Sequence, residues 1–151
     1  MANASSVAAG LGTYKRVDVE TANQGKLIVM LFNGAIQRAE EAKRHIDGGR
    51  NEGAHNSLIR AQEILAELRG ALNMKAGRIA QHLDRVYEYA QHLLIKANLQ
   101  KQGEPIDECV AMLTELRNTW EELFDRLGKE TKRMPPPKIN QHGESIMNLE
   151  G

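Results

Sequence analysis

The chain has 151 residues, and its 20 Lys and Arg residues balance its 20 Asp and Glu residues, so its formal net charge is zero. A length near 150 residues predicts one domain, and a neutral chain lacks the basic field that binding to nucleic acid or to an anionic membrane requires. Its single cysteine, Cys109, excludes an intramolecular disulfide, and its low aromatic content of 4% favours helices over a β-sandwich.

The N-terminal part of the chain predicts a flexible arm followed by a helix. Residues 1–20 are small and polar, and Tyr14 is their one aromatic residue. Thr21 and Gln24 form the capping-box pattern that precedes many helices. Apolar residues then recur with a helical period as far as a Gly-Gly pair that is typical of a helix end, so we expect a helix over about 22–47.

Three more amphipathic helices are expected along the chain. The second extends from a cap at Asn51 to about Asn73, and the third from about Gly77 to residue 103. The fourth begins at Pro105, which suits the first helical turn, and ends at Gly128. The apolar stripes of the four helices are expected to face inward and include Ile28, Leu58, Ile79, Leu83 and Leu113. Short connections make neighbouring helices antiparallel, so the predicted fold is an all-α, up-down-up-down four-helix bundle.

The predicted domain organisation has three parts. Residues 1–20 form the arm, residues 21–128 form the bundle, and residues 129–151 form a mobile tail, because three consecutive prolines interrupt the helical pattern there. Without a secretory signal or an apolar run long enough to span a membrane, the chain is expected to be cytoplasmic and not inserted in a membrane.

The sequence offers little chemistry for an enzyme. Glu52 and His55 form the only Glu-x-x-His pair, and they lie in the first turn of the second helix, where a metal ligand of the bundle core would not be. Cys109 falls on the apolar stripe of an acidic helix, which indicates a buried core residue. We therefore expect no catalytic residue, no metal site, no cofactor and no nucleic acid partner.

The more informative feature is a surplus of apolar residues. Several helices carry apolar side chains beside the stripe that a bundle must bury, for example Ile59, Leu93 and Ile95. Such second faces fit either a wide core or homodimer seam, or a hydrophobic groove that accepts a helix of another protein. Periodicity alone leaves these two interpretations open.

Several runs of residues resemble a known family, the flagellar secretion chaperone FliS. The run from Thr21 to Ala35, TANQGKLIVMLFNGA, is similar to the signature of the family's first helix. Tyr14 lies upstream of it, and further similarities follow in order between residues 61 and 120. The resemblance covers about residues 14–127 and leaves the tail outside.

The resemblance implies a function. Members of the family bind the disordered C-terminal segment of newly made flagellin, prevent its premature polymerisation in the cytosol and deliver it to the export apparatus. An export-gate component or a co-chaperone is a further possible partner, with the acidic fourth helix as a docking surface. The alternative is a helical-bundle dimerisation or regulatory module without a role in secretion.

The groove hypothesis assigns a role to each candidate binding residue. The second apolar faces would build the groove, Gln62 and Asn98 would satisfy backbone groups of the cargo, and Tyr14 would act as a removable plug. Tyr87 and Trp120 are interpreted as core anchors. The expected groove has Ala61 and Leu65 as its floor and Ile64, Leu68, Leu94 and Leu99 as its walls.

Overall fold

A computed structural model describes the backbone of residues 16–133 and the side chains of residues 24–129. All regular structure in this part of the chain is helical. The elements are α2 (Arg16–Asp47), α3 (Asn51–Gly70), the short 3₁₀ helix η1 (Met74–Ala76), α4 (Arg78–Gln100) and α5 (Glu104–Arg133).

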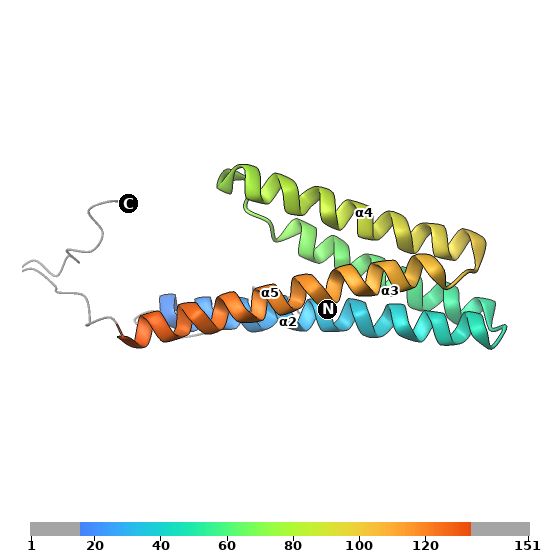
Figure 1. Ribbon diagram of the computed structural model, residues 1–151, viewed down its shortest axis with the longest axis horizontal. Helices are drawn as coiled ribbons and strands as arrows, with labels where there is room; N and C mark the ends of the chain where they lie inside the picture. The colour runs from blue at the N-terminus through green and yellow to red at the C-terminus, as the bar shows by residue number, and fades with distance from the viewer. Residues whose placement is uncertain (1–15, 134–151) are drawn as a thin grey trace, which may run out of the picture.

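The four long helices form an antiparallel up-down-up-down bundle (Figure 1). Helix α2 packs against α3 and α5, and α4 packs against the same two helices on the other side. This order follows from the short turns at 48–50 and 101–103, which leave each helix beside its predecessor. The predicted fold class is confirmed.

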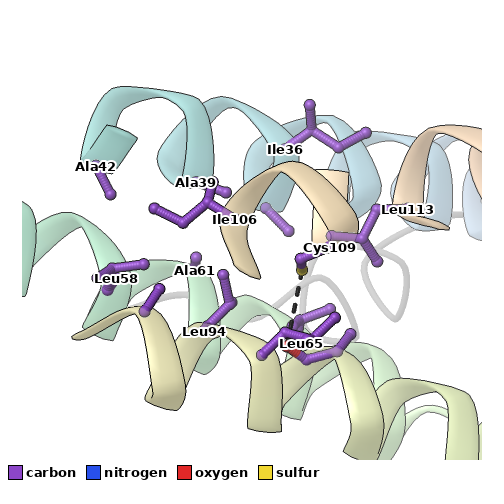
Figure 2. Close-up of a cluster of buried hydrophobic side chains, with 14 of the residues drawn as sticks. Ile36, Ala39, Ala42, Leu58, Ala61, Leu65, Leu94, Ile106, Cys109 and Leu113 are labelled. Carbon is purple, nitrogen blue, oxygen red and sulfur yellow. Dashed lines mark hydrogen bonds between the residues drawn. The ribbon is translucent and has the colours of Figure 1, made fainter. Parts of the chain in front are cut away.

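The core consists of apolar side chains from all four helices, most of them small or medium, with Tyr87 and Phe32 as the largest. On α2 the inward positions are largely alanine, including Ala35, Ala39 and Ala42, which lets the neighbouring helices approach closely. Figure 2 shows how Leu58 of α3 and Ile106 of α5 lie in this cluster. The alanines on one helix therefore accommodate the larger side chains of the others, as close packing requires.

The observed helix starts differ from the predicted ones. Helix α2 begins at Arg16, so Thr21 lies inside the helix and is not its cap. Asn51 is already the first residue of α3, whose cap position is Arg50, and no side chain caps that helix. Tertiary packing of an apolar stripe contributes more to helix stability than a single cap, which explains why a cap motif placed these boundaries wrongly.

The observed helix ends also differ. Helix α3 stops at Gly70. Asn73 caps η1, because its side chain accepts a hydrogen bond of 3.1 Å from the backbone N–H of Lys75. Helix α5 passes through Gly128 to Arg133, because one glycine in a helix costs only about 1 kcal/mol relative to alanine. Residues 16–20 and 129–133 are thus helical, although the sequence predicted an arm and a tail there.

The helices have unequal lengths, and this opens one end of the bundle. Helices α2 and α5 have 32 and 30 residues, whereas α3 and α4 have 20 and 23. In Figure 1 the start of α4 stands away from α5, while α2 and α5 continue together beyond it. The end of the bundle that contains η1 is called the open end below.

Candidate functional site

An apolar pocket lies at the open end, where α3 ends and α4 begins. Its volume is about 210 Å³. All four long helices and η1 contribute to its walls, and its lining is almost entirely apolar. The lining residues are Ile28, Leu68, Ala71, Leu72, Asn73, Ala76, Ile79, Ala80, Leu83, Tyr87 and Trp120.

The pocket exists because the inward stripes of the helices are left uncovered at this end. Ile79 belongs to the predicted inward stripe of α4, yet its side chain is 72% exposed. No side chain from residue 69 to residue 79 is buried. This stretch contains the end of the apolar stripe of α3 and the start of that of α4. Apolar side chains that would form the core of a bundle with equal helices therefore face the pocket and solvent instead.

Aromatic side chains form one wall of the pocket. Trp120 is half-buried and stacks on Phe124, with ring centroids 5.5 Å apart and an interplanar angle of 21°. Tyr87 is buried, and its ring packs at a tilt against Phe32 at 6.1 Å. Burial raises the pKa of the Tyr87 hydroxyl, and a hydrogen bond with the Trp120 side chain opposes that rise.

Charged side chains hold α3 and α4 together beside the pocket. The Arg69 guanidinium donates two hydrogen bonds to Asp84, from Nε at 2.6 Å and from Nη2 at 3.2 Å, and it also contacts Glu88 and Gln91. The guanidinium holds the pKa of the Asp84 carboxyl below its usual value. This cluster, called the Arg69 cluster below, keeps the two shorter helices paired where they leave the other two.

The structure corrects the predicted groove. Ala61, Leu65 and Leu94 have no exposed surface and lie inside the four-helix core (Figure 2). They form neither the floor nor a wall of an outer groove, because they belong to the faces that the bundle itself buries. Leu68 is also buried, with 3% exposure, but it does line the pocket at the open end.

The other predicted site residues are scattered. Ile64 is half-buried, and its Cδ1 atom would lie 3.4 Å from a β-carbon placed on Gly34 of α2. Gln62 is half-buried, and its backbone carbonyl accepts a hydrogen bond from Gln91. Leu99 is 82% exposed on the outer side of α4. The structure therefore does not bring these residues together into one concave site.

Asn98 already has partners within the chain. Its side chain is 2.9 Å from Nδ1 of His55, and Lys101 donates hydrogen bonds to its backbone and side-chain oxygens. Because the amide oxygen accepts from Lys101, the amide nitrogen is the donor to His55. A cargo backbone would have to displace these contacts to reach Asn98. Tyr14, the predicted plug, lies outside the described residues.

Sequence reasoning missed most of the pocket. Ile28, Ile79 and Leu83 were placed on inward stripes, and Trp120 and Tyr87 were interpreted as core anchors. That interpretation is right for Tyr87 but incomplete, since Trp120 is half-buried in the pocket wall. The signal that could have indicated the pocket is the difference in helix length. A better prediction of the start of α2 and of the end of α5 would have shown it.

The described part of the chain offers neither a membrane span nor a metal site. Between residues 16 and 133, no helix is long and apolar enough to cross a membrane. Among those same residues, no three His, Cys, Asp or Glu side chains are grouped to hold a metal ion. The acidic residues of α5 include Asp107, which pairs with Lys43 at 2.6 Å, and Glu108, which accepts from Tyr89.

The described residues thus form a four-helix bundle with an apolar pocket at one end. The family model of flagellar protein FliS matches residues 7–127. The chain therefore belongs to the FliS family, which confirms the resemblance seen in the sequence. Residues 128–151 lie beyond the matched region.

Individual relatives agree with this assignment. The flagellar secretion chaperone FliS of Vibrio cholerae is 28% identical over 118 residues, which cover 75% of this chain and 87% of the relative. That of Bacillus subtilis is 28% identical and covers 78% and 87%. The flagellar secretion chaperone FliSB of Pseudomonas aeruginosa is 30% identical and covers 72% and 90%.

Proposed function

We propose that this protein is a flagellar export chaperone that binds the disordered C-terminal segment of flagellin. In this proposal it prevents premature polymerisation in the cytosol and hands the subunit to the export apparatus. The observation that carries the proposal is the apolar pocket at the open end of a chain that belongs to the FliS family. Membership of the family supports the proposed cargo, and the pocket supports the proposed location of its binding.

The pocket meets the physical requirements for binding an unfolded segment. A cargo that is unfolded before binding loses conformational entropy when it becomes ordered, so the gross contact energy must exceed that cost. The pocket has room for a large apolar side chain, and the half-exposed Leu123 and Leu127 lie on α5 beyond Trp120. An amphipathic segment can therefore anchor one side chain in the pocket and continue along α5.

Binding alone is sufficient for the proposed protection. A chaperone that covers the apolar stripe of flagellin lowers the concentration of free, assembly-competent chains by mass action. This requires neither ATP nor a catalytic group. Release at the export apparatus then needs only a competing partner, for which the acidic side chains of α5 are the proposed contact.

The proposal keeps part of the predicted site and replaces the rest. Leu68 remains a binding residue because it lines the pocket, and Ile79 and Trp120 join it. Gln62, Ile64, Asn98 and Leu99 become candidates for a secondary contact on the outer side of α3 and α4. Ala61, Leu65 and Leu94 support the bundle from inside and contact cargo only if the bundle opens.

Two exposed residues of α4 allow a matched test. Ile79 lines the pocket and is 72% exposed, whereas Leu99 is 82% exposed and lies more than five turns away on the same helix. Binding of a synthetic peptide with the C-terminal sequence of flagellin is measured by calorimetric titration. We expect Ile79→Asp to weaken binding at least about tenfold, or ~1.4 kcal/mol, and Leu99→Asp to change it little.

The opposite result would overturn the assignment. If Leu99→Asp abolishes binding and Ile79→Asp does not, the cargo uses the outer side of α4 as the sequence predicted. If the wild-type protein does not bind the peptide at all and sediments as a stable dimer, the dimerisation module is the better interpretation. Helical circular dichroism of both variants excludes unfolding as the cause.

The proposed plug is tested separately. Tyr14 precedes α2 by two residues, and α2 starts at the open end of the bundle (Figure 1). Tyr14→Ala should leave peptide affinity unchanged or raise it if the tyrosine competes with the cargo. A large loss of affinity would instead make Tyr14 part of the binding site.

A further inference from the structure

Gly25 is an unusual residue for its position. It is buried in α2, where a glycine is less favourable than alanine by about 1 kcal/mol. The described glycines with a positive φ are Gly49 and Gly77, so the backbone at residue 25 has a conformation that alanine adopts equally well. The reason for a glycine must therefore be space.

The space is occupied by the ring of Phe124 from α5. A β-carbon at residue 25 would lie 3.0 Å from Cγ and Cδ1 of that ring and 3.2 Å from Cδ2. These distances are shorter than ordinary van der Waals contacts, and they involve a whole ring and not one flexible chain end. The α2 backbone at Gly25 thus lies directly against the face of Phe124.

Phe124 in turn supports the wall of the pocket. Its other neighbour is Trp120, which stacks on it at 5.5 Å and lines the pocket. Tyr87 lines the same pocket, and its hydroxyl interacts with the Trp120 side chain. The indole therefore stacks on a ring that itself rests on the α2 backbone.

We infer that Gly25 is a positioning residue, which sets the shape of the pocket by letting Phe124 approach α2 closely enough to hold Trp120 in the pocket wall. A side chain at residue 25 would push Phe124 away from α2 and move the stacked indole with it. The consequence for cargo binding depends on the proposed function, whereas the consequence for Trp120 does not.

The chain provides its own reporter for this inference. Trp120 is its only tryptophan, so its fluorescence emission and near-UV circular dichroism report directly on the pocket wall. We expect Gly25→Ala to shift the emission maximum and to weaken binding of the flagellin C-terminal peptide about tenfold, with the helical content kept. A role of Gly25 in stability alone would move the melting temperature and leave the emission of the folded protein unchanged.

Gly34 supplies the matched control. It lies in the same helix, and its β-carbon would meet only the flexible end of Ile64, at 3.4 Å. Gly34→Ala should leave the emission of Trp120 and the peptide affinity unchanged. An equal effect of both substitutions would refute the inference, because it would show a general response of α2 to lost glycine.

A double-mutant cycle tests whether the effect passes through Phe124. In a Phe124→Leu background the ring is absent, so Gly25→Ala should have much less effect on emission and affinity than in the wild type. This variant also removes the crowding, so it remains informative if Gly25→Ala alone fails to fold. Additive effects would overturn the inference. If the wild type does not bind the peptide, the proposed function fails, and the emission measurements still decide the role of Gly25.

Discussion

Single residues show how completely the core excludes solvent. Cys109 has no exposed surface, and its Sγ atom lies 3.7 Å from the carbonyl oxygen of Ala90 (Figure 2). Burial, with a smaller contribution from Glu108, raises the pKa of the thiol to about 12. The sequence interpretation of Cys109 as a core residue is confirmed, and the thiol has none of the surroundings that make a cysteine reactive.

The first prediction concerns this thiol. Because the pKa of the Cys109 thiol rises from its ordinary 9.0 to about 12, the folded protein has roughly a thousandfold less thiolate at neutral pH than an unfolded chain. A chromogenic disulfide reagent should therefore not modify Cys109 in the folded protein and should modify it fully in denaturant. Rapid modification of the native protein would show that α4 and α5 separate readily.

The second prediction concerns the Arg69 cluster. The pKa of Asp84 is lowered from its ordinary value of 3.8, so its contribution to stability is complete above pH 3.8 and is lost as the pH falls through the lower folded-state value. Urea unfolding should show Arg69→Met to be less stable than the wild type at neutral pH. The difference should shrink below pH 3.8.

A second ion pair serves as the control for this prediction. Arg60 pairs with Glu63 within α3 at 3.1 Å, and both side chains are half exposed to solvent. Pairs of this kind contribute little to stability. Arg60→Met should therefore change the unfolding midpoint much less than Arg69→Met. An Arg69→Met effect that stays constant through acid pH would show that Asp84 is not the group responsible.

At the scale of single elements, a glycine ends one helix and is tolerated inside another. Gly49 ends the turn after α2 with φ +72°, a conformation that other residues rarely adopt. Gly128 lies within α5 with nothing near the position of its β-carbon. The same residue type therefore has a conformational role at one site and only weakens a helix at the other.

The third prediction follows from this contrast. Gly128→Ala should raise the free energy of unfolding by about 0.5–1 kcal/mol, because alanine is the better helix former. Gly49→Ala should lower it by about 1–2 kcal/mol, because a β-carbon is strained in the left-handed conformation. Thermal unfolding of both variants measures the difference. A stabilising Gly49→Ala would show that the turn does not need that backbone conformation.

At the scale of the whole molecule, α2 and α5 continue together beyond the shorter α3 and α4 at the open end (Figure 1). The Arg69 cluster joins α3 to α4 near the open end, and Arg117 of α5 donates a hydrogen bond of 2.9 Å to Asn33 of α2. Towards the other end, Tyr89 of α4 donates a hydrogen bond to Glu108 of α5, and all four helices pack together. Local stability should therefore decrease from that end towards the pocket.

The fourth prediction tests this gradient by hydrogen exchange with mass spectrometry. Backbone amides in residues 71–83 should exchange faster than those in 54–65 and 87–97, because few buried side chains hold that stretch. Addition of the flagellin peptide should slow exchange in 71–83. Uniform protection along α3 and α4 would contradict the description of an open end.

The sequence predicted the fold far better than the site, for a physical reason. Periodicity identifies which positions of a helix face the core, and Leu58 and Leu113 are buried as their stripes required. It does not indicate how far along each helix a neighbour covers that face. Leu94 was therefore assigned to a groove although it is covered, and Ile79 to the core although it is exposed.

The longer helices α2 and α5 have one further consequence. At about 1.5 Å per residue they extend to roughly 45–48 Å, against roughly 30–35 Å for α3 and α4. The excess length forms an overhang in which only two helices pack together, instead of the four of the bundle. Two helices alone bury little apolar surface, and the helicity of this overhang should vary with whatever occupies the vacant half of its cross-section. A bound amphipathic segment would then cover apolar surface of the overhang that the chain by itself leaves bare.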